Sequence, residues 1–212
     1  MIDRAKLQAV LAKSITHPIE GIFYRSIPAG ALYKFDPPQP LWSLGPGMSG
    51  QRFTPIGGPP ALYVAESPQT TLYEGNSLAA SLFAHVATRP AIPATVTISV
   101  RAKLLHVLDL SDESILETLG LTQDDLFCAW KELMLKGLEV PTHTLADVAY
   151  GVTGLQAIRF PSNQDATGVN LVIWTRKIKS PCYIEVDDPS GTLWQRVPKV
   201  SPTKRGSKRL HR

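Results

Sequence analysis

The segment from residue 50 to residue 74 reads GQRFTPIGGPPALYVAESPQTTLYE and is expected to decide the fold. Glycines and prolines interrupt residues 50–60, so no helix or strand can continue through them. Residues 61–65 form a short apolar run bounded by such breakers, which predicts a strand. Ser67 and Pro68 predict a helix start, because serine can cap free amides and proline at the first helical position loses no hydrogen bond.

Three polar side chains are spread over these predicted elements. Arg52 lies at the end of the loop, Tyr63 on the strand and Glu74 about two turns into the helix. A strand and a helix packed together could aim all three into one cleft. The helix is predicted to carry apolar or aromatic side chains at Leu72, Tyr73, Ala79, Leu82, Phe83 and Val86.

Length and composition favour one globular domain. The chain has 212 residues, of which 43% are hydrophobic, enough to fill one sizeable core. Cys128 and Cys182 lie far apart without metal-ligand spacing, which indicates a reducing compartment. The N-terminus lacks the apolar run of a signal peptide, and no stretch approaches a membrane span. We expect a cytoplasmic protein with its globular domain at residues 1–198.

The net charge of +4 is concentrated at the C-terminal end. Residues 199–212 hold six basic and no acidic side chains, which leaves 16 basic against 18 acidic side chains in the rest. A tail rich in Ser, Pro, Gly, Lys and Arg is predicted to be disordered and to act as a solubilising terminus. The alternative is a module that binds nucleic acid through phosphate neutralisation by this tail.

The rest of the chain predicts a mixed α+β domain in which helices are inserted between runs of strands. Residues 29–49 contain many prolines and glycines, and are expected to be a structureless loop that covers a site or extends into solvent. Asp3, Ser111 and the Thr122 capping box are the predicted helix starts. Helices are predicted at 3–13, 111–119, 122–136 and 141–153, and strands at 20–27, 95–100, 104–110, 155–160, 169–174, 182–186 and 192–197.

Several common chemistries have no sequence signature here. The chain has no phosphate-binding loop with its lysine, no His-Glu-x-x-His, no Cys-x-x-Cys and no glycine-flanked nucleophilic serine. The five histidines have no ligand spacing. No metal site is predicted.

Five short patterns together resemble the RES domain, a family named for its arginine, glutamate and serine. The resemblance covers roughly residues 21–174, and eleven residues separate Arg52 from Tyr63 and Tyr63 from Glu74. The chain departs from the family in the proline-rich loop before Gly50 and in Phe53, where tryptophan is frequent. The patterns are Tyr24-Arg25, Gly50-x-Arg52-Phe53, Leu62-Tyr63-x-Ala65-x-Ser67, Leu72-x-Glu74 and Arg159-Phe160-Pro161-Ser162 with Asn170-Leu171-Val172.

The resemblance implies a toxin of a bacterial toxin–antitoxin pair that consumes NAD+, with a fold similar to diphtheria-type ADP-ribosyltransferases. Members of the family either degrade NAD+ by hydrolysis or phosphorolysis, or transfer ADP-ribose to a protein. The implied partner is an Xre-like helix-turn-helix antitoxin that blocks the site, and a homo-oligomer is possible. Whether water, phosphate or a protein side chain is the acceptor stays open.

The chemistry of NAD+ cleavage suggests a role for each candidate residue. Glu74 would hold a ribose hydroxyl and stabilise the cation that develops in an oxocarbenium-like transition state. Arg52 and Arg25 suit the pyrophosphate, because a guanidinium forms paired hydrogen bonds with phosphate oxygens. Tyr63 offers an aromatic face to the cationic nicotinamide ring. Ser162 could bond the ribose or orient Glu74, although a turn hydroxyl is the simpler reading of that residue alone.

Overall fold

The computed structural model describes residues 3–13, 16–83 and 94–199, with side chains from residue 76 to residue 83 left out. Of the predicted apolar helix face, Val86 lies outside the described residues, as do the side chains of Ala79, Leu82 and Phe83. The basic tail beyond Lys199 also lies outside them. The prediction of a disordered tail therefore stays a prediction.

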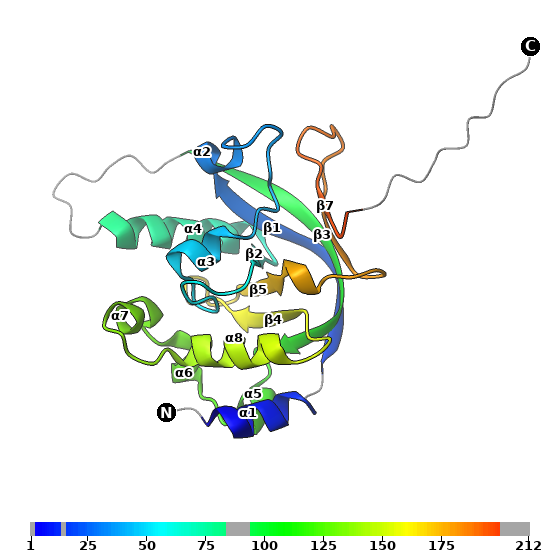
Figure 1. Cartoon of the computed structure of the whole chain (residues 1–212). Helices are drawn as coiled ribbons and strands as arrows, with labels where there is room; N and C mark the ends of the chain where they lie inside the picture. Colours follow the sequence, from blue (N-terminus) through cyan, green and yellow to red (C-terminus); the bar gives the residue numbers. More distant parts are fainter. Residues whose placement is uncertain (1–2, 14–15, 84–93, 200–212) are drawn as a thin grey trace, which may run out of the picture.

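A seven-stranded sheet forms the centre of the molecule (Figure 1). Its order is β1-β2-β5-β4-β3-β6-β7, and an additional pairing joins β1 to β3. Five strands therefore pair in a closed ring, from β1 through β2, β5, β4 and β3 back to β1. The strands are β1 (His17–Pro28), β2 (Ala61–Ala65), β3 (Thr95–Asp109), β4 (Ala157–Pro161), β5 (Val169–Trp174), β6 (Tyr183–Val186) and β7 (Arg196–Val197).

Strands β2, β4 and β5 are buried on both faces, so the sheet separates two hydrophobic cores. On β2, Leu62 and Val64 belong to one core while Ala61 and Tyr63 face the other. The same alternation continues along β4 and β5, because successive strand side chains point to opposite faces. Residues of these strands are therefore held from both sides.

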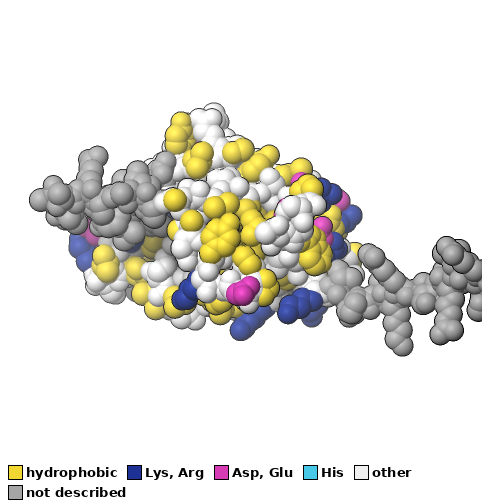
Figure 2. All heavy atoms as spheres, turned by 90° about the horizontal axis from the view of Figure 1, so that it is seen from above, with side chains coloured by type: hydrophobic (Ala, Val, Ile, Leu, Met, Phe, Trp, Pro, Cys, Tyr) yellow, Lys and Arg dark blue, Asp and Glu magenta, His cyan; other side chains and the backbone are white. Residues whose placement is uncertain are grey.

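Helices α1 (Arg4–Leu11), α5 (Glu113–Leu119), α6 (Gln123–Phe127) and α8 (Pro141–Gly151) contribute side chains to the core that contains Trp174. In the view of Figure 1, α1, α5 and α8 lie below strands β4 and β5, and α4 (Pro68–Phe83) lies above them. The short helices α2 (Ala29–Leu32), α3 (Gly45–Ser49), α7 (Trp130–Leu135) and η1 (Thr175–Lys177) lie in the connections. From above, hydrophobic and uncharged side chains occupy the middle of the described surface, with charged ones toward its edge (Figure 2).

The structure confirms the predicted loop, strand and helix around residue 60. β2 spans the predicted residues, and α4 begins at Pro68 as expected. Ser67 Oγ accepts a hydrogen bond from the Thr70 amide at 3.0 Å, which caps the helix. The Asp3 cap of α1 and the Thr122 capping box of α6 are confirmed as well.

Three boundaries between predicted elements were wrong. The strands predicted at 95–100 and 104–110 are one strand, because β3 pairs with β1 along almost its whole length. The helix predicted at 122–136 breaks at Cys128, whose backbone is extended, and continues as α7. The segment at 29–49 is not structureless, since α2 and α3 lie within it.

Smaller corrections concern the ends of elements. Asp112, not Ser111, caps α5, because its carboxylate accepts from the Ser114 amide at 2.9 Å. The helix predicted to end at Thr153 ends at Gly151, and the last strand is limited to Arg196–Val197.

Candidate active site

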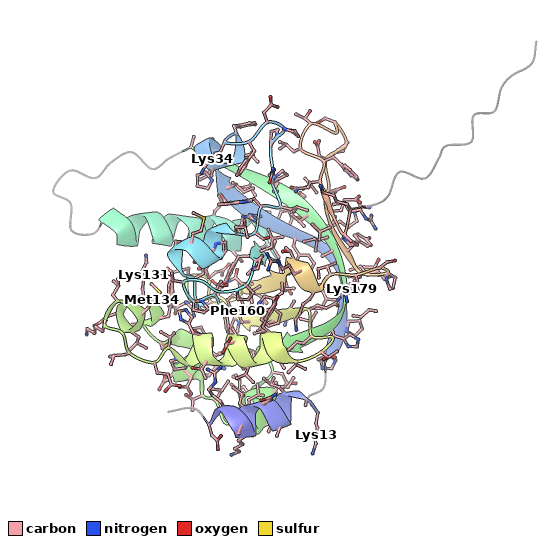
Figure 3. All side chains as sticks on the ribbon, viewed as in Figure 1. Lys13, Lys34, Lys131, Met134, Phe160 and Lys179 are labelled. Carbon is pink, nitrogen blue, oxygen red and sulfur yellow. The ribbon has the colours of Figure 1, made fainter. Side chains whose placement is uncertain are left out.

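A cavity of about 1140 Å³ opens between the strand ends, α4 and the connection from α6 to α7. Four of the five predicted site residues line it, namely Arg25, Arg52, Tyr63 and Glu74. Figure 3 shows Phe160, another lining residue, near the middle of the molecule, and Lys131 between α4 and α7. The fold therefore brings together side chains from a loop, two strands and a helix.

Glu74 lies in the second turn of α4 and is half-buried in the cavity wall. Its Oε1 accepts a hydrogen bond from Ser162 Oγ at 2.6 Å and another from Asn170 Nδ2 at 2.8 Å. Neither donor carries a charge. The carboxylate is thus oriented by two neutral side chains from β5 and from the loop after β4.

Ser162 is buried behind Glu74 and does not line the cavity. Its oxygen accepts from the backbone amides of Gln164 at 3.1 Å and Asp165 at 3.2 Å. A hydroxyl oxygen has two acceptor positions, so its hydrogen is directed at Glu74. Of the two roles expected for Ser162, this geometry matches the orientation of Glu74, and the hydroxyl forms a turn at the same time.

Hydrogen bonds fix both the guanidinium and the backbone carbonyl of Arg52. Its Nη1 donates to the Leu126 carbonyl at 2.8 Å, and its own carbonyl accepts from Thr142 Oγ1 at 2.5 Å. The next carbonyl back, of Gln51, accepts from His143 Nε2 at 2.8 Å. Burial lowers the pKa of Arg52, while the nearby Glu74 carboxylate acts in the opposite direction. No ion pair joins Arg52 to Glu74.

The turn before Arg52 requires a glycine. Gly50 has φ +75°, in the left-handed region where a side chain is strained. A Cβ at this position would also lie 2.7 Å from Met134 Sδ. Gly50 therefore lets the Arg52 loop pass close to α7.

Tyr63 fixes the same loop from the strand side. Its hydroxyl accepts from the Phe53 amide at 3.0 Å and shares a hydrogen bond of 2.9 Å with Thr54 Oγ1. Burial is the main cause that raises the pKa of the Tyr63 phenol. The hydroxyl is therefore used to hold the loop, a function that the sequence did not indicate, while the side chain lines the cavity.

Arg25, on β1, forms no ion pair with any residue that the structure describes. Its Nη2 donates to the Trp42 carbonyl at 3.1 Å, and its buried Nη1 has no hydrogen-bond partner in the described part of the chain. Burial lowers the pKa of Arg25 to about 10. A buried donor without a partner is costly, so a ligand with acceptor oxygens would relieve this site.

The sequence alone does not indicate a role for Asn170 or for the wall between α6 and α7. Asn170 belongs to one of the family patterns, but its contact with Glu74 joins residues 96 positions apart. The wall residues Phe127, Cys128 and Trp130 line the cavity because α6 and α7 are separate helices. Burial is the main cause that raises the pKa of the Cys128 thiol.

Arg159 belongs to the same family pattern but lies outside the cavity. Its Nε and Nη2 bond both oxygens of Glu66 at 2.7 and 3.0 Å, and its Nη1 bonds Asp109 at 2.9 Å. This arginine joins β4 to β3 and to the residue after β2. Its contacts are structural.

The comparison with protein families agrees with the arrangement of these residues. A family model described as the RES domain matches residues 22–194. The chain belongs to the RES domain family. The resemblance inferred from short patterns is thus confirmed, and the RES domain match extends past Trp174 to include β6.

The RES domain fold also has a counterpart among solved structures. A chain in the crystal structure of the M. tuberculosis MbcT–MbcA toxin–antitoxin complex is 19% identical, with 91% of each chain covered and a TM-score of 0.65. At this identity the likeness shows a shared fold. No curated protein matches the chain.

Over residues 3–13, 16–83 and 94–199, no group of three or more His, Cys, Asp or Glu side chains is arranged to hold a metal ion. Within the same described ranges, no helix is both long enough and apolar enough to cross a membrane.

Proposed function

We propose that the chain is the toxin of a bacterial toxin–antitoxin pair and that it consumes NAD+ by cleaving the nicotinamide–ribose bond. The observation that carries this proposal is the charge arrangement of the cavity. Glu74, whose Oε1 accepts from two neutral donors, faces the same space as Arg25 and Arg52, and neither arginine forms an ion pair among the described residues. NAD+ has the complementary pattern of a cationic nicotinamide riboside and an anionic pyrophosphate.

Glu74 is the proposed catalytic residue. As nicotinamide leaves with the electrons of the glycosidic bond, positive charge develops on the ribose, and a carboxylate beside it stabilises that charge. The donors Ser162 and Asn170 hold the carboxylate without neutralising it. The Tyr63 side chain, in the same cavity, is the proposed contact for the nicotinamide ring.

Arg25 and Arg52 are the proposed pyrophosphate ligands. Phosphate oxygens would supply the missing acceptor for Arg25 Nη1 and would add a charged partner to Arg52. The cavity of about 1140 Å³ exceeds the roughly 300 to 1,000 Å³ that is usual for small-molecule sites. A dinucleotide is a ligand of suitable size for it.

The acceptor completes the reaction. A water or phosphate oxygen would form the new bond to the ribose carbon that nicotinamide leaves, giving ADP-ribose or its phosphate ester. The alternative is a protein side chain as acceptor, which would make the protein an ADP-ribosyltransferase. A diphtheria-type ADP-ribosyltransferase fold and an Xre-like antitoxin, both implied by the family resemblance, complete the proposal. So does a cytoplasmic location, which is expected from the two widely separated cysteines.

The direct test is to incubate the purified protein with NAD+, with and without inorganic phosphate, and to measure free nicotinamide. We expect release by the wild-type protein and none by Glu74→Gln. A dependence on phosphate would identify phosphorolysis, and release that requires an added protein would identify ADP-ribosyl transfer. Absence of release under all three conditions, from protein shown to be folded, would contradict the proposal.

The toxin role has a separate test in cells. Expression of the wild-type chain in bacteria should arrest growth and lower cellular NAD+, whereas Glu74→Gln should do neither at equal protein level. Growth arrest by both proteins would contradict a toxin that acts through this cavity.

A further inference from the structure

Two structural elements fix the Glu74 carboxylate. Ser162 and Asn170 both donate to the same oxygen, Oε1, at 2.6 and 2.8 Å. The Ser162 hydroxyl is itself fixed by the amides of Gln164 and Asp165. Two donors on one carboxylate oxygen restrict rotation about the last bond of the glutamate side chain, so the direction of the other oxygen is set as well.

Asn170 is a rigid donor because of its place in the sheet. It lies on β5, where its backbone pairs with Ala65 of β2 on one side and with Phe160 of β4 on the other. Its side chain is buried, at 6% exposed. A central strand with both neighbours present moves less than a loop, so the amide provides a fixed point for Glu74.

A second connection lies one helical turn before Glu74. Thr70 Oγ1 donates to Asp165 Oδ2 at 2.7 Å, and Thr70 and Glu74 lie on the same face of α4 because they are four residues apart. Asp165 follows Ser162 in the loop between β4 and β5. The helix and the loop are therefore joined at two levels, by Thr70 with Asp165 and by Glu74 with Ser162.

Arg52 is the charged side chain with which Glu74 could form an ion pair in place of its hydrogen bonds to Ser162 and Asn170. It lines the same cavity, and the charge of Glu74 acts on its pKa, yet the two side chains form no ion pair. A Glu74–Arg52 ion pair would neutralise both the carboxylate that faces the ribose and the guanidinium that faces the pyrophosphate. The donors Ser162 and Asn170 hold Oε1 without adding a positive charge to the site.

We infer that Asn170 is a positioning residue, whose amide keeps the Glu74 carboxylate directed at the ribose and away from Arg52. The consequence for catalysis rests on the proposed function. Asn170 lines the cavity, and its side-chain amide donates to Glu74, so its effect is expected to pass through that carboxylate. Its loss should therefore lower kcat more than it weakens NAD+ binding.

The kinetic test compares Asn170→Ala and Asn170→Asp with Gln156→Ala. Gln156 is the matched control, because its buried side chain bonds the backbone amides of Leu105 and His106 and does not line the cavity. We expect Asn170→Ala to lower kcat about 10²-fold with little change in KM, since a displaced catalytic group costs about that factor. Gln156→Ala should lower the melting temperature and leave kcat unchanged.

Asn170→Asp provides a readout that a purely structural role would not change. The substitution keeps the shape, but an ionised carboxylate repels Glu74, and only its protonated form can donate the hydrogen bond. Relative to wild type at each pH, the activity of Asn170→Asp should therefore recover as the pH falls. A constant ratio at all pH values would overturn the inference, as would an Asn170→Ala effect confined to KM.

Crystal structures of Asn170→Ala and Asn170→Asp test the positioning independently of any substrate. We expect the Glu74 side chain to turn toward Arg52 in both variants. An unchanged Glu74 orientation would overturn the inference even if activity falls. If the wild-type protein releases no nicotinamide, the proposed function fails while these structures still decide whether Asn170 positions Glu74. Asn170→Asp, being isosteric, serves this purpose if Asn170→Ala does not fold.

Discussion

Two groups of charged residues in this domain differ in the hydrogen-bond partners of their arginines. On β4, Arg159 forms ion pairs with Glu66 and Asp109, and all three of its side-chain hydrogen bonds to described residues go to carboxylates. In the cavity, the hydrogen bonds of Arg25 and Arg52 to described residues go to backbone carbonyls, and Glu74 Oε1 accepts from two neutral side chains.

The difference separates charges that are paired within the protein from charges that a ligand would pair under the proposed function. The Arg159 group is compensated within the protein, so it needs nothing from outside. The two cavity arginines are desolvated by burial and form no ion pair within the described ranges, which destabilises the ligand-free protein. A site that keeps such charges apart is suited to a ligand that carries both signs.

The largest expected difference between the two groups concerns catalysis. Glu74→Gln should lower kcat for nicotinamide release by about 10²- to 10³-fold, because the stabilisation of the developing cation is lost. Glu66→Gln, the same substitution in the Arg159 group, should leave kcat unchanged. Steady-state kinetics on both purified variants checks this, and equal losses would contradict the distinction.

The gain in protein stability on ligand binding should depend on the cavity arginines and not on Arg159. ADP-ribose at 100 times its Kd should raise the free energy of unfolding of the wild-type protein by about 2.7 kcal/mol. Arg25→Met should lose most of this gain, because the pyrophosphate loses a charged partner. Arg159→Met should retain it. Thermal or urea unfolding with and without ADP-ribose measures the effect, and a gain of the same size in Arg25→Met would argue against pyrophosphate at this residue.

Without ligand, the two arginines should affect stability with opposite signs. Arg25→Met removes a buried guanidinium nitrogen without a partner and should raise the free energy of unfolding by about 1 to 3 kcal/mol. Arg159→Met breaks bonds to two carboxylates and should lower it by about 2 kcal/mol. Urea unfolding of both variants checks the signs. A lower free energy of unfolding in Arg25→Met would show that the buried Nη1 of Arg25 does not destabilise the wild-type protein.

The smallest expected effect is a pH dependence of the loop that carries Ser162. The hydrogen bond from Thr70 lowers the pKa of Asp165 below its ordinary value of 3.8. The stabilisation is therefore present above that value and is lost as the pH falls through the lower pKa of the folded state. Thr70→Val should flatten the stability curve in this acid range. An unchanged slope in Thr70→Val would show that this bond does not contribute.

Local signals made the central part of the fold predictable. Ser67 and Pro68 mark the start of α4, and the breakers around residues 61–65 bound β2, so both elements follow from neighbouring residues. The break at Cys128 was not predictable in the same way. The apolar pattern continues through it, and the extended backbone there forms part of the cavity wall.

The site was predictable only as far as residue type and order carry information. The spacing of Arg52, Tyr63 and Glu74 predicts a shared cleft, and the structure places the three side chains around one cavity. The sequence alone could not show that Arg159 is compensated and Arg25 is not, because Arg159 and its partner Glu66 are 93 positions apart. The alternation of polar and apolar residues does not single out Asn170, because β5 is buried on both faces.

The central claim is that the cavity binds one dinucleotide with its ribose at Glu74 and its pyrophosphate at the two arginines. The most direct measurement is a crystal structure of the protein with an NAD+ analogue whose carbocyclic ribose cannot be cleaved. We predict the nicotinamide-bearing ring beside Glu74, with the pyrophosphate oxygens bonded to Arg25 and Arg52. An analogue bound elsewhere, or bound here with its pyrophosphate away from both arginines, would contradict the account.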